Sequence, residues 1–138
     1  MTDAIEHLMP HLLVAPILLP MVTAAVMLLL GDRRRPAKQV LNALACLLNL
    51  ALAVALLLWV RHAGQQAVGV YLPGNWPVPY GIVLVADHLS VMMLALTAVL
   101  ALASTSYASA RWDRAGVHFH PLFQMQILGL NGAFLTGD

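Results

Sequence analysis

The chain has 138 residues, of which 61% are hydrophobic and only 9% are charged, and its formal net charge is +1. Soluble domains average about 45–50% apolar and about 25% charged residues, and a short chain buries too small a fraction of its surface to hide so much apolar area from water. The composition therefore excludes an ordinary soluble domain, and no cluster of Lys and Arg beside aromatic residues supports nucleic-acid binding.

Long apolar stretches follow one another along the chain. The first two, over 12–30 and 40–60, contain no charged residue, and a helix of about 20 residues matches the hydrocarbon thickness of a bilayer. The third, over 81–106, is interrupted only by the charged and polar pair at 87–88, and the fourth, over 119–136, is shorter and more polar. We therefore predict an all-α polytopic bundle of three to four transmembrane helices, forming a single membrane region over 1–138.

The basic residues predict how these helices are oriented. Loops rich in Lys and Arg face the cytoplasm in most membrane proteins. Loops 31–39 and 107–120 hold all the basic residues except Arg61, namely Arg33, Arg34, Arg35, Lys38, Arg111 and Arg114. We therefore expect both loops to be cytoplasmic, the N-terminus to lie outside, and the stretch 71–80, rich in Pro and Gly, to form an ordered or extended outer loop.

Two neighbouring polar residues, Asp87 and His88, fall one to two turns inside the third predicted span, near its outer end. An ionised side chain at bilayer depth is costly unless it is paired or hydrated, so such residues are candidates for function. The pair is either an access point for an ion or proton, or a hydrated anchor at the membrane interface, and the sequence leaves both interpretations open.

Four amide side chains predict contacts between helices. Asn42 and Asn49 are seven residues apart and share a helix face with Cys46, and Gln124 and Asn131 repeat that spacing in the fourth stretch. Polar side chains of this kind form hydrogen bonds between membrane helices. We therefore expect the four amides to be packing residues, and Cys46, the single cysteine, to be a small packing residue.

His118 and His120 raise the question of a metal site. Residues two apart do not share a helix face, no third ligand is near, and a structural zinc site needs about four ligands. We predict no metal site and expect a solvated pair in the inner loop. The alternative is a protonatable role at the inner mouth, because histidine titrates near neutral pH.

No glycine-rich phosphate loop, nucleophile elbow or pair of catalytic carboxylates occurs in the sequence. The chain is therefore not predicted to be an enzyme, and no cofactor is expected.

Three stretches carry a resemblance to a known family. They are Gly74-Asn-Trp-Pro-Val-Pro-Tyr-Gly-Ile-Val-Leu-Val-Ala-Asp87 with the following Leu89-Ser90 and Leu96-Thr97, then 118–124, and then 129–138. Together they resemble the D-type subunit of the multisubunit Mrp-type Na+(K+)/H+ antiporters, which is similar to the proton-pumping membrane subunits of respiratory complex I. The likeness covers most of 72–138, whereas the first two spans fit only in position and length.

The resemblance implies that the chain is the N-terminal part of an antiporter-like fold of about fourteen helices in the bacterial inner membrane. The implied activity couples inward proton movement to outward Na+ or K+ movement, and the implied partners are the other antiporter subunits, these ions and the lipid bilayer, with no nucleic acid.

The resemblance also implies where the proton-handling groups lie. The family's key groups are a buried glutamate in the fifth helix and lysines in later helices, which would lie beyond Asp138. No catalytic residue is therefore expected in this chain, and its ion-pathway candidates are Asp87, His88, His118 and His120. The alternative function is a proton-translocating membrane subunit of a complex I-like NADH:quinone oxidoreductase or a membrane hydrogenase.

Overall fold

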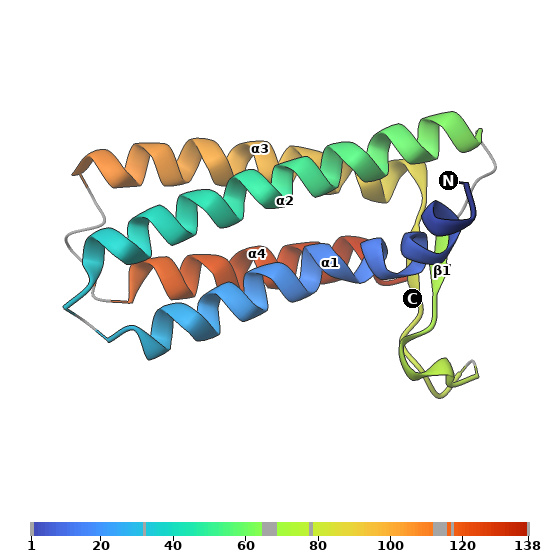
Figure 1. Cartoon of the computed structure of the whole chain (residues 1–138), viewed down its shortest axis with the longest axis horizontal. Helices are drawn as coiled ribbons and strands as arrows, with labels where there is room; N and C mark the ends of the chain where they lie inside the picture. The colour runs from blue at the N-terminus through green and yellow to red at the C-terminus, as the bar shows by residue number, and fades with distance from the viewer. Residues whose placement is uncertain are drawn as a thin grey trace.

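The computed structural model describes residues 2–31, 33–64, 69–77, 79–111, 116 and 118–137. These residues form four long helices: α1 (Thr2–Leu29), α2 (Arg35–Ala63), α3 (His88–Arg111) and α4 (Phe119–Leu135). The helices lie side by side in one elongated bundle, with α2 and α4 running in one direction and α1 and α3 in the opposite direction (Figure 1).

A short β-hairpin lies at the end of the bundle where both termini are found (Figure 1). β1 (Gly69–Tyr71) pairs antiparallel with β2 (Leu84–Ala86), with Gly69 opposite Ala86. A single 3-10 turn, η1 (Pro73–Asn75), follows β1, and its Gly74 adopts φ 74°, a conformation that costs glycine little. The hairpin also binds the end of α4, because the Gly137 N–H donates to the Val83 carbonyl at 2.8 Å.

The third helix begins later than the sequence predicts. It starts at His88 instead of near Gly81, and part of the intervening segment pairs with β1 as strand β2. An apolar run of a few residues does not by itself distinguish a strand from a helix. The predicted all-α bundle therefore carries a small two-stranded sheet, and Asp87 lies just before the helix and not one to two turns inside it.

The two predicted cytoplasmic loops are shorter than expected. α2 begins at Arg35, with Pro36 in its first turn, where proline is favoured. Lys38 therefore belongs to the helix, and it is only 2% exposed. At the other loop α3 continues to Arg111 and α4 starts at Phe119. Arg114 and Trp112 lie outside the described residues.

The bundle buries small and polar side chains together with some large apolar ones, and it exposes many other large apolar side chains. Its core includes Ala24, Ala53 and Ala98, each at most 1% exposed, whereas Leu29 is 87% and Leu122 67% exposed. Small residues let membrane helices approach closely, while large apolar residues face lipid. Three described segments, His11–Leu29, Arg35–Ala63 and His88–Ala110, are long and apolar enough to cross a membrane. Together these features identify a multi-pass membrane protein.

Candidate functional site

The four amides predicted to pack helices face one another between α2 and α4. The Gln124 Nε2 donates to Asn42 Oδ1 at 2.7 Å, and the Asn131 Nδ2 donates to Asn49 Oδ1 at 3.4 Å. The two partners of each pair are 82 residues apart, which is the constant offset expected for two helices running parallel. We call these four residues the amide ladder.

The first rung of the amide ladder, Asn42 with Gln124, extends to α3 and closes into a ring. Asn42 Nδ2 donates to Thr105 Oγ1 at 3.3 Å, and the Cys46 Sγ lies 3.5 Å from Thr105 Oγ1 and 3.6 Å from Gln124 Nε2. All four side chains are at most 2% exposed. The ring therefore joins α2, α3 and α4 in the interior, with Cys46 as one of its members.

The second rung, Asn49 with Asn131, extends to α1 instead. The Asn131 Nδ2 donates to the Pro16 carbonyl at 2.7 Å. That carbonyl is free to accept because the residue four positions later, Pro20, has no N–H to donate in the helix. Two polar atoms of this rung, Asn49 Nδ2 and Asn131 Oδ1, are buried without a hydrogen-bond partner within the described part of the chain.

The chemistry of the amide ladder is that of neutral donors and acceptors. Asn and Gln side chains do not titrate near neutral pH, so the ladder by itself offers no group that picks up and releases protons. Hydrogen bonds between membrane helices average about 0.6 kcal/mol and reach about 1.7 kcal/mol. The ladder can therefore hold the helices in one register.

Two titratable residues lie on the same faces of α2 and α4 as the amide ladder. They are one helical turn nearer the end of the bundle where the arginine-rich turn joins α1 to α2. Lys38 lies four residues before Asn42, and His120 lies four residues before Gln124, so the offset of 120 − 38 = 82 matches the ladder. Lys38 is 2% and His120 is 7% exposed. The prediction that His118 and His120 form a solvated pair is therefore wrong for His120, whereas His118 is exposed at the start of α4.

Sequence patterns predict part of this arrangement, but besides His120 they miss three buried polar residues. Lys38 is expected in a loop, although its spacing of four from Asn42 is a signal for a shared helix face. The polar face of α2 is evident in the sequence, but the burial of Thr105, which bonds to Asn42 of that face, is not. Thr105 lies near the C-terminal end of α3 among Ser residues, and no local pattern there distinguishes it as buried. Thr23, 7% exposed, bonds back to the Leu19 carbonyl in its own helix at 2.7 Å.

Asp87 acts as the N-cap of α3. Its Oδ1 accepts the Ser90 N–H at 2.8 Å, and its carbonyl accepts the Val91 N–H at 3.1 Å. The Ser90 hydroxyl, followed by the Ser90 N–H, holds the pKa of the Asp87 carboxyl below its ordinary value of 3.8. The neighbouring His88 is exposed. The structure therefore separates the candidates Asp87 and His88 from His118 and His120, which lie at the opposite end of the bundle.

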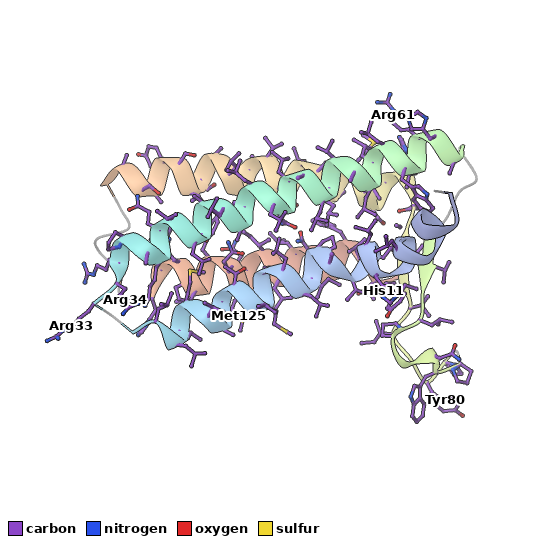
Figure 2. The ribbon with its side chains drawn as sticks, viewed as in Figure 1. His11, Arg33, Arg34, Arg61, Tyr80 and Met125 are labelled. Carbon is purple, nitrogen blue, oxygen red and sulfur yellow. The ribbon has the colours of Figure 1, made fainter. Side chains whose placement is uncertain are left out.

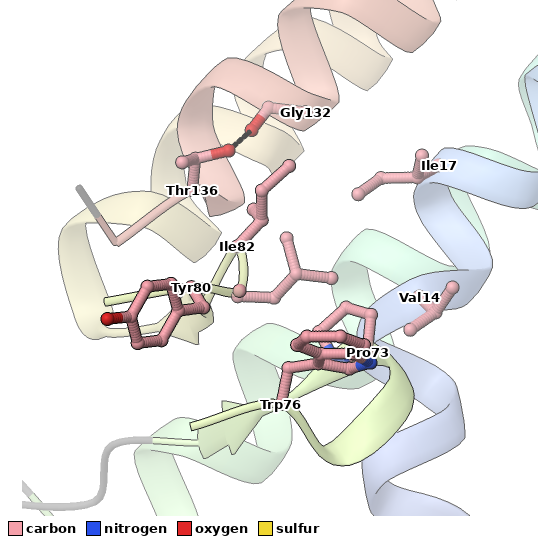
Figure 3. Close-up of a pocket in the computed structure, with 10 residues that line it drawn as sticks. Val14, Ile17, Pro73, Trp76, Tyr80, Ile82, Gly132 and Thr136 are labelled. Atoms are coloured by element: carbon pink, nitrogen blue, oxygen red, sulfur yellow. Dashed lines mark hydrogen bonds between the residues drawn. The ribbon is translucent and has the colours of Figure 1, made fainter. Parts of the chain in front are cut away.

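Two hollows lie at the hairpin end of the bundle. The larger, of about 680 Å³, lies between α1, the hairpin and the end of α4, and its mostly apolar lining includes Val14, Ile17 and Trp76 (Figure 3). A smaller one, of about 280 Å³, lies between Arg61 and His88. Within the described part of the chain, no three His, Cys, Asp or Glu side chains are grouped to hold a metal ion.

Comparison with known proteins identifies relatives along the whole chain, although no family model matches it. It is 48% identical to a probable K(+)/H(+) antiporter subunit of the D type from Rhizobium meliloti, over 100% of this chain and 25% of the relative. It is 31% identical to the Na(+)/H(+) antiporter subunit of the same type from Alkalihalophilus pseudofirmus, over 94% of this chain and 26% of the relative.

A solved structure agrees with these relatives. The fold matches a chain of the Mrp complex from Dietzia sp. DQ12-45-1b with a TM-score of 0.82 and 28% sequence identity, over 95% of this chain and 24% of that chain. The chain thus spans about a quarter of the length of the proteins it matches.

Proposed function

Because the chain belongs to the family of D-type subunits of Mrp-type cation/proton antiporters, we propose that it forms part of a secondary transporter that couples inward proton movement to the efflux of Na+ or K+. The observation that carries this proposal is the 48% identity, over the whole chain, to a relative named as a probable K+/H+ antiporter subunit. The partners would be the other subunits of such a complex, and the protein would be a transporter component and not an enzyme.

The described helices would contribute the scaffold of the transporter. The hydrogen bonds of the amide ladder and its ring join amides, a hydroxyl, a thiol and a backbone carbonyl, and such bonds hold membrane helices together. The titratable candidates lie at the two ends of the bundle, with Asp87 and His88 at one and His118 and His120 at the other. We propose that these pairs are sites where ions or protons approach the transporter, not the groups that drive coupling.

The orientation of the bundle follows from its charges. Figure 2 places Arg33 and Arg34 at one end of the bundle and Arg61 at the other. The positive-inside rule assigns the end with the arginine turn to the cytoplasm. The hairpin and the N-terminus would then face the outside of a bacterial inner membrane, with the large apolar side chains of the bundle against lipid.

Cation-dependent proton movement in everted membrane vesicles tests the function. Vesicles from cells that carry the complete antiporter operon should release an imposed proton gradient on addition of Na+ or K+, and vesicles lacking this subunit should not. Restoring the subunit from a plasmid is the control. Exchange that persists at the full rate after the deletion would remove the proposal.

A further inference from the structure

We propose that one ordered water molecule is bound inside the bundle at the second rung of the amide ladder, where it joins Asn49 Nδ2 to Asn131 Oδ1. The site lies between α2 and α4 and close to α1, whose Pro16 carbonyl binds the same Asn131 side chain. This inference does not depend on the transport activity, because it rests only on the burial and the bonding of the two amides.

Both amides of this rung are buried and only half satisfied. Asn131 is 0% and Asn49 is 3% exposed, yet the Nδ2 of Asn49 and the Oδ1 of Asn131 have no hydrogen-bond partner within the described residues. A buried polar group left without a partner costs about 1–3 kcal/mol. Because the two groups belong to one rung, we expect them to share a ligand that the described part of the chain does not supply.

Exchanging the oxygen and nitrogen positions of either side-chain amide does not supply the missing hydrogen-bond partners. The Asn131 Nδ2 lies 2.7 Å from the Pro16 carbonyl and 3.4 Å from Asn49 Oδ1. If Asn131 were turned, its oxygen would face both of these oxygens. If Asn49 were turned, its NH2 group would face the NH2 group of Asn131. The orientation that the structure has is thus the one that makes the most hydrogen bonds, and it still leaves one donor and one acceptor.

The chemistry of the two atoms selects water over an ion. Asn49 Nδ2 is a donor and needs an acceptor, whereas Asn131 Oδ1 is an acceptor and needs a donor. Water is both, and buried waters typically make about three hydrogen bonds to polar groups of this kind. A Na+ or K+ ion would be repelled by the N–H donor, and an anion would be repelled by the carbonyl oxygen.

The first rung explains why the second one needs a ligand. There, α3 contributes the Thr105 hydroxyl, which accepts from Asn42. Two turns away on the same face of α3, seven residues earlier in the sequence, stands Ala98, which is 1% exposed and carries no polar atom. A water molecule would take the place at the second rung that a hydroxyl takes at the first.

Density for the water in the assembled full-length complex is the direct test, at a resolution that shows ordered water. We expect one peak within hydrogen-bonding distance of both Asn49 Nδ2 and Asn131 Oδ1, with the same height in Na+ and in choline buffers. The absence of a peak, a peak that contacts only one of the two atoms, or a peak that requires Na+ would overturn the proposal.

A stability measurement gives an independent answer. If water is bound, Asn49→Leu expels it, leaves Asn131 Oδ1 unpaired, and lowers the melting temperature of the purified complex. If the rung is dry, the same change removes an unpaired buried donor along with the 3.4 Å bond from Asn131 Nδ2; these two effects offset each other, and an unchanged melting temperature would refute the water. Gln126→Leu is the matched control, because it replaces an exposed amide on α4.

Discussion

Gln124 is the side chain that completes the first rung of the amide ladder. Its Nε2 reaches Asn42 Oδ1 at 2.7 Å and Cys46 Sγ at 3.6 Å, so a single amide of α4 engages two residues of α2. Because the ring is buried, its polar groups have no water to replace a lost partner, and each of them depends on the others.

Replacing Gln124 by Leu should destabilise the protein. The change leaves Asn42 Oδ1 buried without its donor, which costs about 1–3 kcal/mol. Thermal unfolding of the purified complex in detergent measures the effect. Gln126→Leu, an exposed position on the same helix, should change the melting temperature much less, and equal effects of the two variants would contradict the assigned role of the ring.

Asp87 combines a structural role with a charge at the predicted outer surface. Its pKa is lowered by the Ser90 hydroxyl and N–H, so the folded state favours the ionised form. The resulting stabilisation is complete above the ordinary pKa of 3.8 and is lost as the pH falls through the lower pKa of the folded state. The cap is therefore intact at neutral pH and is lost only below the ordinary pKa of 3.8.

Two substitutions at Asp87 separate the cap from the charge. Asp87→Ala removes the side-chain acceptor and should lower stability by about 1 kcal/mol. Asp87→Asn keeps an acceptor that caps helices about as well, and should leave stability at neutral pH nearly unchanged. Exchange activity of Asp87→Asn in everted vesicles then decides the role: a fall assigns the charge to an ion route, and an unchanged rate leaves the residue as a helix cap alone.

At the scale of elements, the hairpin contacts the helix ends on its side of the bundle. β2 pairs with β1 on one side, and Leu84 forms an isolated bridge with Thr136 just after α4. The contact is close, because a Cβ at Gly137 would collide with the Val85 side chain. The end of α4 is therefore held by backbone hydrogen bonds that need a glycine beside the strand.

Substitution of Gly137 should loosen this contact. Gly137→Ala places a methyl group against Val85 and is expected to weaken the bond from the Gly137 N–H to the Val83 carbonyl. Hydrogen–deuterium exchange of the residue-137 amide, which donates this hydrogen bond, should accelerate. Gly129→Ala is the control, because a Cβ at that position meets nothing within 4 Å. Equal exchange in the two variants would show that the hairpin does not depend on this close approach.

At the scale of the whole molecule, charge is sorted between the two ends of the bundle. Arg33, Arg34 and Arg35 are exposed at the turn between α1 and α2, and Arg61 is exposed near the opposite end. The positive-inside rule uses such a distribution to assign the end richer in Lys and Arg to the cytoplasm. The proposed topology therefore has a direct chemical test.

Cysteine labelling in intact cells and in everted vesicles tests the topology. In a Cys46→Ser background, a membrane-impermeant maleimide should label Arg61→Cys in intact cells and Arg33→Cys only in everted vesicles. The Cys46 thiol of the native chain, 1% exposed, serves as the unlabelled control. The opposite pattern would reverse the orientation proposed above.

The sequence by itself determined that lipid surrounds this protein and which polar residues of the second and fourth helices could bond to one another. Uncharged apolar stretches that match the bilayer thickness indicate membrane-spanning helices. The spacing of seven residues, which separates Asn42 from Asn49 and Gln124 from Asn131, predicted the two helix faces that interact. Apolar length and residue spacing are properties of a single helix, so both predictions could be made without knowing which helices are in contact.

Only the tertiary structure decided which residues lie inside. Lys38 and His120 are buried within the folded bundle, and segment 84–86 is a strand because β1 lies beside it. These outcomes depend on contacts between residues far apart in the chain, such as Asn42 with Thr105 or Asn131 with Pro16. Local hydrophobicity does not predict such partners, because an apolar stretch has the same hydrophobicity pattern whether lipid, a strand or another helix covers it.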